Sequence, residues 1–339
     1  RAKGHQVVEF PDEADAYVVN TCSVTAVSDQ KSRQVIHGVQ RKHPGAVVAV
    51  CGCYPQTHAD DVRKLGVDLI SGTGDRTGFI RLLEEAAAEK RQIEAIDQPF
   101  ERRVFEVLPA GGLGGRTRAM LKVEDGCVNF CTYCIIPYAR GRVRSLPVPT
   151  AVEQTRALAA EGYREIVVTG IEISSWGQDL KNGETLIDLL EAVCTAAPAV
   201  RIRLGSLEPR TITEEFCRRA AALPNLCPQF HLSMQSGCDD TLKRMNRKYD
   251  TTRYAQSVAL LNQYFDHPAV TTDLITGFPE ETEEEFAQTL DFIRRCGFAQ
   301  MHIFPYSVRP GTPAAKMRQV PKAVKEERAR QAAAVAEAL

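Results

Sequence analysis

Short apolar runs alternate with longer amphipathic stretches along the first hundred residues of the chain. Buried strands produce such short apolar runs, whereas apolar positions three and four residues apart are typical of helices that cover a sheet. This alternation with short connections predicts an N-terminal doubly wound parallel α/β domain, whose sites gather at the carboxyl ends of the strands. The predicted strands are residues 6–10, 16–22, 46–53 and 67–72. The predicted helices are residues 27–43, 55–65 and 75–92.

A second alternation follows a glycine-rich connector, PAGGLGGRTR, at residues 109–118. It repeats six strand-helix units, fewer than the eight of a closed (β/α)8 barrel, and therefore predicts a six-fold (β/α) open barrel. We expect an N-terminal domain at 1–96, a linker at 97–117, the barrel at 118–320 and a C-terminal helix at 321–339. The predicted barrel strands are residues 119–125, 164–170, 200–206, 229–235, 269–276 and 300–307. The predicted barrel helices are residues 150–162, 186–197, 214–223, 251–265 and 282–297.

Composition narrows the class of protein. A chain of 339 residues with 44% hydrophobic and 25% charged residues is typical of a soluble globular protein of two domains. We find no apolar run of membrane-spanning length and no signal-peptide pattern, and so expect a cytoplasmic location without membrane contact. A net charge of −1 gives no global signal for nucleic-acid binding. Eleven cysteines in a reducing compartment favour metal binding or redox chemistry over disulfides.

Three of these cysteines stand close together in the segment GCVNFCTYCIIPYARGR, residues 126–142. Cys127, Cys131 and Cys134 have the spacing C-x3-C-x2-C and follow the first barrel strand directly. A structural zinc site normally takes four protein ligands, and no fourth cysteine or histidine follows at the spacing of a zinc finger. Buried core thiols are the other alternative. Three soft thiolates suit a 4Fe-4S cluster of which one iron stays open.

This loop at this position in a six-fold barrel resembles the radical S-adenosylmethionine (SAM) superfamily. The resemblance implies that the open iron binds the amino and carboxylate groups of SAM. It also implies that one electron then splits SAM to give a 5′-deoxyadenosyl radical. Further segments resemble the same group of enzymes, each at or just after a barrel strand, and supply polar side chains there. The candidate SAM-binding residues are Glu172, Ser206, Glu208, Gln235 and Asp273.

Two cysteines of the N-terminal domain also lie at the ends of predicted strands, Cys22 in VVNTCSVT and Cys53 in AVCGCYPQ. Together with the barrel motif, these turns resemble the methylthiotransferase family. The resemblance implies an auxiliary 4Fe-4S cluster held by three cysteines on three strand-end loops. Two of these match here, and we expect the third to precede Arg1, in a part of the protein that this chain lacks. Cys51 lies on the opposite face of the strand, and we interpret it as a core residue.

The closest resemblance is to the enzymes that act on threonylcarbamoyladenosine in tRNA, and it is carried by the combination of NTCSVTAVSDQKSRQ (20–34), CTYCIIPYARGRVRS (131–145) and HLSMQSGCDDTLKRMNRKY (231–249). That resemblance implies addition of a 2-methylthio group to the modified adenosine beside the anticodon. It implies two stages, in which one SAM methylates a sulfur at the auxiliary cluster and a second supplies the radical. The expected partners of the chain, which we interpret as a monomer, are the tRNA anticodon stem-loop and an electron donor such as flavodoxin or ferredoxin.

Two runs of basic residues could form the edge of an RNA site. Arg140, Arg142 and Arg144 follow the cysteine loop directly. A second run comprises Lys243, Arg244, Arg247 and Lys248. The family normally ends in a small β-barrel RNA-binding domain, which we expect to lie beyond Leu339. Other substrates remain open, namely isopentenyladenosine in tRNA or an aspartate of a ribosomal protein, as does a non-catalytic iron-sulfur module for electron transfer.

Overall fold

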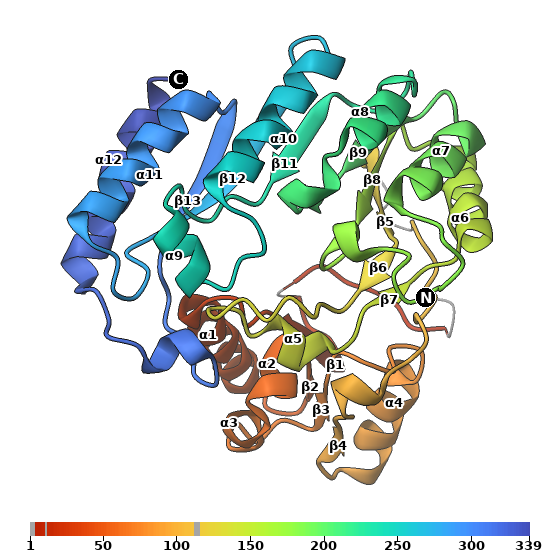
Figure 1. Cartoon of the computed structure of the whole chain (residues 1–339). Helices are drawn as coiled ribbons and strands as arrows, with labels where there is room; N and C mark the ends of the chain where they lie inside the picture. The colour runs from red at the N-terminus through yellow and green to blue at the C-terminus, as the bar shows by residue number, and fades with distance from the viewer. Residues whose placement is uncertain (1–3, 11, 112–115) are drawn as a thin grey trace. The chain divides into compact units, whose positions relative to one another are not determined.

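The computed structural model describes residues 4–10, 12–111 and 116–339. Figure 1 labels its helices and strands in chain order. The chain divides into two compact units. The first comprises Arg1–Arg102 with Tyr138–Gly141, and the second comprises Arg103–Pro137 with Arg142–Leu339. The predicted domain boundaries stay predictions, and residues 112–115 of the glycine-rich connector lie outside the described residues.

A four-stranded parallel sheet in the order β1-β2-β3-β4 forms the centre of the first unit. Its strands are β1 (Ala16–Thr21), β2 (Val47–Gly52), β3 (Leu69–Ser71) and β4 (Ile93–Ala95). The helical segments in this part of the sequence are α1 (Ala26–Lys42), α2 (Cys53–Thr57), α3 (Ala59–Arg63), α4 (Phe79–Glu89) and the 3-10 turn η1 (Pro99–Glu101). The parallel α/β architecture predicted for this part of the chain is confirmed.

Alternate residues of β2 belong to two different hydrophobic cores. Val48 and Val50 pack in one core with Ile36 of α1. Ala49 packs in the other with Ala86 of α4. Because successive side chains of a strand point to opposite faces, the two helices cover opposite faces of the sheet. The near-continuous apolar sequence of β2 follows from this burial on both sides.

Two parallel sheets, in the orders β5-β8-β9 and β10-β11-β12-β13, form the second unit. Between β9 and β10 only Gly205 intervenes, and its N–H donates to the carbonyl of Val168 at 2.8 Å. The six units thus run continuously, and within the described residues β5 and β13 do not pair, as an open barrel requires. The strands are β5 (Arg118–Lys122), β8 (Glu165–Thr169), β9 (Arg201–Leu204), β10 (Ser206–Leu207), β11 (Gln229–Leu232), β12 (Ala269–Thr276) and β13 (Gln300–Pro305).

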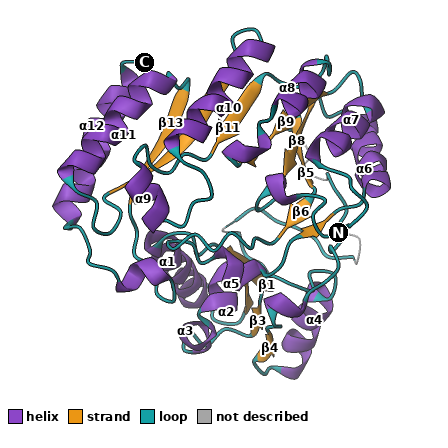
Figure 2. Ribbon diagram, viewed as in Figure 1, coloured by secondary structure: helices purple, strands orange, loops and turns teal. Residues whose placement is uncertain are grey.

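Helices lie along the outer side of these strands (Figure 2). Strand residues such as Leu121 and Phe230 share one core with helix residues such as Leu190 and Ile293. Burial of one helix face against a strand face is what stabilises a β/α barrel. The helices are α6 (Val148–Ala160), α7 (Leu186–Ala196), α8 (Glu214–Ala221), α9 (Asp239–Arg244), α10 (Thr251–Tyr264), α11 (Glu283–Cys296) and α12 (Lys322–Glu337). The 3-10 turns are η2 (Ile173–Ser175), η3 (Pro209–Thr211) and η4 (Pro313–Lys316).

Three predictions for the first hundred residues are wrong in detail. Residues 6–10 form no strand, and Val7 and Phe10 are 63% and 65% exposed, so this apolar pair gains nothing from burial. The helix predicted at 55–65 is two short helices, α2 and α3, separated at His58 with φ −137° and ψ 50°. Strand β4 was not predicted, because only Ile93 of its three residues is buried.

The first barrel strand also differs from its prediction of 119–125. It ends at Lys122, and β6 (Glu124–Asp125) then pairs antiparallel with β7 (Arg144–Ser145). The cysteine loop and the helix α5 (Ile136–Arg140) lie between these two short strands in the sequence. Among the described residues, no helix is both long and apolar enough to cross a lipid bilayer.

Candidate functional site

The three cysteines of the C-x3-C-x2-C motif lie on one loop, between β6 and α5. The N–H of Cys134 donates to the carbonyl of Cys131 at 2.9 Å, which closes a tight turn. Burial raises the pKa of the Cys127 thiol to about 12, and the charges of Glu172, Cys134 and Cys131 add to this effect. The three sulfurs are therefore close enough to influence one another, and an isolated Cys127 thiol would stay protonated at neutral pH. Metal coordination deprotonates such a thiol.

Within the described ranges, no three His, Cys, Asp or Glu side chains converge on one point as the ligands of a single metal ion do. A 4Fe-4S cluster makes a different demand, because each thiolate binds its own iron at a separate corner of the cube. Three soft donors without a fourth protein ligand fit that cluster better than they fit a closed zinc site.

The carboxylates of Glu172 and Glu208 lie in neighbouring strand-end turns. Glu172 precedes η2 and its side chain accepts from the N–H of Ser174 at 3.2 Å. The hydroxyl of Ser174 accepts from the N–H of Glu208 at 2.8 Å, so one serine links both turns. Burial raises the pKa of Glu172, and the charge of Glu208 contributes. Arg210 donates to both oxygens of Glu208 at 2.9 Å.

The other three candidate SAM-binding residues lie on three adjacent strands or their ends. Ser206 of β10 pairs in register with His231 of β11 and is exposed. The Nε2 of His231 lies 3.2 Å from the Oδ2 of Asp273 in β12. Gln235 has φ +65° and donates its N–H to the carbonyl of Asp273 at 2.9 Å. A left-handed conformation at a residue other than glycine is strained, and such strain is frequent at ligand sites.

Cys22 and Cys53 follow the ends of two paired strands of the first unit. Thr21 of β1 pairs with Gly52 of β2, so each cysteine is the next residue after the last registered pair. The structure thus brings these two predicted ligands to the same edge of the sheet. Cys53 is buried and Cys22 is exposed. Cys51 is paired in register with Asn20, and burial raises the pKa of its thiol.

Replacing Gly52 with alanine is expected to destabilise the first unit by about 3 kcal/mol or more. Gly52 has φ +104°, and an added Cβ would lie 2.5 Å from the carbonyl oxygen of Thr21 and 2.8 Å from Asn20 Oδ1. The midpoint of urea unfolding measures the change. The matched control is Gly38→Ala within α1, where an added Cβ meets no atom within 4 Å. Equal midpoints for the two variants would contradict this prediction.

The arginines predicted to contact RNA differ in exposure. Arg142 is exposed and Arg140 is half-buried in α5. Arg144 is buried, donates to the carbonyl of Arg142 at 2.6 Å and lies 3.3 Å from Asp125 Oδ2. Solvent therefore reaches Arg142 most readily, whereas Arg144 joins β7 to β6.

The second basic run divides in the same way. Lys243 and Lys248 are exposed. Arg244 instead forms an ion pair with Glu285 of α11, with Nη1 2.8 Å from Oε1. Arg247 donates to the sulfur of Cys131 at 3.3 Å. This contact could not be predicted from the sequence, because 116 residues separate the two partners.

Glu124 of β6 was not predicted as a site residue. Its side chain is fully buried, and its Oε2 accepts from the N–H of Glu172 at 2.7 Å. Its Oε1 is buried and has no hydrogen-bond partner among the described residues. Burial raises the pKa of Glu124 to about 9, so the carboxyl is neutral at pH 7. The available signal was an acidic pair, Glu124 and Asp125, in an apolar strand just before the cysteine loop.

Replacing Glu124 with glutamine is expected to stabilise the chain at pH 8 and to have little effect at pH 5. The folded carboxyl keeps its proton up to about pH 9, whereas the unfolded carboxyl loses it near its usual value of 4.5. Wild-type stability therefore falls between these values, by at most about 1.4 kcal/mol per pH unit, and the neutral amide removes that fall. Urea unfolding at the two pH values measures it.

Glu165→Gln is the control of opposite sign. Hydrogen bonds from Arg203 lower the pKa of Glu165, so its charge stabilises the folded chain above about pH 4.5. That variant is expected to lose stability at pH 8. If Glu124→Gln shifts the midpoint equally at pH 5 and pH 8, Glu124 is not the neutral buried acid described above.

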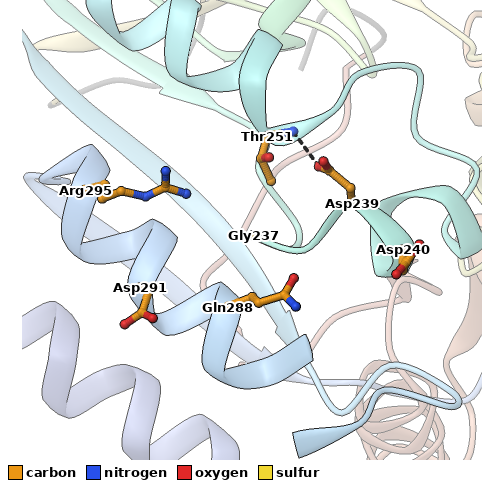
Figure 3. A pocket seen from close by; sticks show the side chains of 7 residues that line it. All are labelled: Gly237, Asp239, Asp240, Thr251, Gln288, Asp291 and Arg295. Carbon is orange, nitrogen blue, oxygen red and sulfur yellow. Dashed lines mark hydrogen bonds between the residues drawn. The ribbon is translucent and has the colours of Figure 1, made fainter. Parts of the chain in front are cut away.

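A surface hollow of about 480 Å³ lies beside α9, α10 and α11 (Figure 3). One hydrogen bond crosses it, from the N–H of Thr251 to the Oδ1 of Asp239 at 2.7 Å. None of the candidate site residues lines this hollow. Its lining residues are Gly237, Asp239, Asp240, Thr251, Gln288, Asp291 and Arg295.

Family models match both parts of the chain. The model of the Radical SAM superfamily matches residues 121–293. A second model, described as uncharacterized protein family UPF0004, matches residues 1–72. Among solved structures, the radical SAM methyltransferase TsrM from Kitasatospora setae aligns with a TM-score of 0.68 at 16% identity. That alignment covers 90% of this chain and 66% of TsrM. At this identity the likeness concerns the fold alone, and it confirms the predicted barrel architecture.

Curated relatives are similar over nearly the whole chain. Proteins named threonylcarbamoyladenosine tRNA methylthiotransferase MtaB from Bacillus subtilis (strain 168) and Aquifex aeolicus (strain VF5) are 40% and 37% identical to it. These matches cover 99% and 97% of this chain and 75% and 80% of the relatives. A tRNA-2-methylthio-N(6)-dimethylallyladenosine synthase from Clostridium botulinum (strain Loch Maree / Type A3) is 35% identical over 97% of this chain and 74% of the relative. The chain therefore belongs to the radical SAM methylthiotransferase family.

Proposed function

We propose that this chain is a tRNA methylthiotransferase that adds a 2-methylthio group to N6-threonylcarbamoyladenosine beside the anticodon. The observation that carries the proposal is the three-cysteine loop after the first barrel strand, in a chain 40% identical over 339 residues to a relative of that name. Relatives of that name are 36–40% identical and relatives named for the dimethylallyladenosine product are 34–36% identical, so the higher identities favour threonylcarbamoyladenosine as the substrate.

Cys127, Cys131 and Cys134 are the proposed ligands of a 4Fe-4S cluster. When bound, the cluster supplies the single electron that cleaves SAM to methionine and a 5′-deoxyadenosyl radical. The chain's own task is to hold SAM close to the cluster and to exclude water from the radical. Glu172 and Glu208 are suited to accept hydrogen bonds from the SAM amino group or ribose. The carboxylate of Glu172 lies close enough to Cys127 to raise the pKa of its thiol, and the charge of Glu208 in turn acts on Glu172.

Gln235, Asp273 and Ser206 are proposed to complete the SAM site. Gln235 follows β11, Asp273 lies within β12 and Ser206 begins β10, so the three come from adjacent strands of the barrel. The contact between Asp273 and His231 holds that carboxylate in place. Holding SAM and the adenosine in the right geometry lowers the barrier to the reaction between them.

Cys22 and Cys53 are proposed to hold a second 4Fe-4S cluster that carries the sulfur to be transferred. Support comes from their positions, side by side at one sheet edge in the part that matches the second family model. A third ligand would have to come from outside this pair. Cys51 is a weaker candidate for it, because its position on β2 is paired with Asn20 rather than following the strand end.

The tRNA anticodon stem-loop is the proposed partner. An unstacked loop base can be taken out of the stack and read by its edges, which suits chemistry at adenosine C2. Arg142, Lys243 and Lys248 are the exposed cations of the two basic runs and are proposed to contact phosphates. A one-electron donor such as flavodoxin or ferredoxin completes the reaction, and we place the protein in the cytoplasm as a monomer.

The experiment is mass spectrometry of tRNA nucleosides from a strain that lacks the gene for this chain. We expect the 2-methylthio derivative of threonylcarbamoyladenosine to disappear while threonylcarbamoyladenosine itself remains. The intact gene and a Cys296→Ala gene should restore the derivative, and a Cys134→Ala gene should not. Loss of the dimethylallyladenosine derivative, or of a modified ribosomal-protein aspartate, would contradict the substrate assignment.

A further inference from the structure

A short segment that begins at the last residue of α9, residues 244–247, holds the cysteine loop. We call it the clamp. The N–H of Thr132, between the second and third cysteines, donates to the carbonyl of Met245 at 3.0 Å. The hydroxyl of Thr132 donates to the carbonyl of Arg244 at 2.8 Å. Its carbonyl accepts from the N–H of Ala314 at 2.9 Å. All three polar groups of Thr132 are thus used to fix the loop.

Asn246 of the clamp fixes the residues between the first and second cysteines. Its side-chain Nδ2 donates to the carbonyls of Phe130 at 2.9 Å and Asn129 at 3.3 Å. Phe130 has φ +47° and Asn246 has φ +58°. A bulky side chain rarely adopts a left-handed conformation, and it persists only where the surroundings hold it. The two amide hydrogen bonds are part of what holds this turn of the loop.

Arg247 of the clamp reaches a cysteine itself. Its Nη1 lies 3.3 Å from the sulfur of Cys131 and 3.5 Å from the hydroxyl of Tyr133. Its Nε donates to the hydroxyl of Tyr249 at 3.0 Å, and its Nη2 donates to the carbonyl of Ser233 at 3.4 Å. The guanidinium carbon also lies 4.8 Å from the centre of the Tyr249 ring. These contacts hold the permanently charged guanidinium of Arg247 beside the sulfur of a proposed cluster ligand.

We propose that Arg247 is a positioning residue that raises the reduction potential of the cluster bound at Cys127, Cys131 and Cys134. The proposal rests on the proposed function, which supplies the cluster. Reduction brings one electron from an external donor onto the iron and adds one negative charge. A nearby cation stabilises the reduced form more than the oxidised form, and hydrogen bonds to the sulfurs of a cluster are known to set its potential. Arg247 gives up no proton in this step.

This assignment differs from the RNA contact that the basic run suggests. A phosphate ligand needs a guanidinium with free donors at the surface. All three nitrogens of Arg247 already donate within the chain, and the side chain is half-buried.

Lysine at position 247 would keep the charge but lose the planar fork that reaches the sulfur, the tyrosines and the carbonyl together. Replacing Arg247 with lysine therefore removes the geometry and keeps the charge, whereas replacing it with glutamine removes the charge.

The experiment measures the reduction potential of the anaerobically reconstituted full chain by a redox titration followed by electron paramagnetic resonance. In Arg247→Gln, at equal iron content, we expect the ratio of reduced to oxidised cluster at a given potential to fall roughly tenfold. A tenfold change corresponds to about 59 mV for a one-electron couple. Arg247→Lys should show a smaller fall. Asn246→Ala should keep the wild-type potential and lower the melting temperature of the iron-free protein.

Arg203→Gln is the matched control. Arg203 of β9 is also half-buried and bonded, but its partners are Glu165 and Gln229. It should leave the potential unchanged. A wild-type potential in Arg247→Gln overturns the proposal, and so does loss of iron binding in both Arg247 variants, because the arginine would then only hold the loop. If the wild-type chain itself binds no iron, the proposed function fails before this inference is reached.

Discussion

Replacing Cys134 with alanine is expected to abolish SAM cleavage by the chain. A cluster that keeps one iron open for SAM has only three protein ligands, so the loss of any one leaves a second iron without a protein ligand. After anaerobic reconstitution and addition of dithionite, 5′-deoxyadenosine should fall to the level of the reaction without protein. Iron bound by the barrel part of the chain should fall with it.

Cys296→Ala is the control for this experiment. Cys296 ends α11, is half-buried like Cys134, and packs against the hydrophobic core of the second unit. We expect this variant to retain both iron and 5′-deoxyadenosine formation. Retained SAM cleavage in Cys134→Ala would show that Cys134 is not a ligand, and the proposed three-cysteine site would be wrong.

Replacing Arg328 with methionine is expected to destabilise the second unit by about 3–5 kcal/mol. Arg328 of α12 is buried, with Nη1 2.8 Å from Oε2 of the buried Glu281 and Nη2 2.6 Å from Glu283. Without the guanidinium, the buried Glu281 loses its ion pair with Arg328. Its pKa is raised by burial to about 7 even with Arg328 present. The variant should therefore lose more stability at pH 8 than at pH 6, where the carboxyl takes up a proton.

Arg330→Met tests whether the effect belongs to the buried pair. Arg330 lies on the same helix and pairs with Glu327, but both side chains are exposed. Removal of an exposed pair should change the unfolding free energy by less than about 1 kcal/mol. Equal losses of stability in the two variants would contradict the prediction, because the loss would then not come from the buried pair of Arg328 and Glu281.

The barrel could be predicted from the sequence because each of its units has a strong local pattern. Strand β12 is buried along most of its length, and α11 begins at a Thr282–Glu285 capping box that is visible in the sequence. The cysteine loop was visible for a similar reason, because its ligands are close in the chain. Their type and spacing carry the chemical signal.

The missed features depend on contacts between distant parts of the chain. Strands β6 and β7 have two residues each, too few for a periodic pattern, and only their pairing identifies them. Arg247 looked like surface charge until the fold placed it on Cys131. Arg144 looked the same, and its guanidinium instead lies beside Asp125. Basic residues can line RNA or support a site, and sequence spacing alone does not separate these roles.

The most direct measurement is electron paramagnetic resonance of the reduced Cys22→Ala/Cys53→Ala double variant, recorded with and without SAM. This variant leaves Cys127, Cys131 and Cys134 as the proposed ligands. We predict about four iron atoms per chain, the signal of a reduced 4Fe-4S cluster, and a change in that signal when SAM binds its open iron. Protein that contains zinc in place of iron, or a signal that SAM leaves unchanged, would contradict the account.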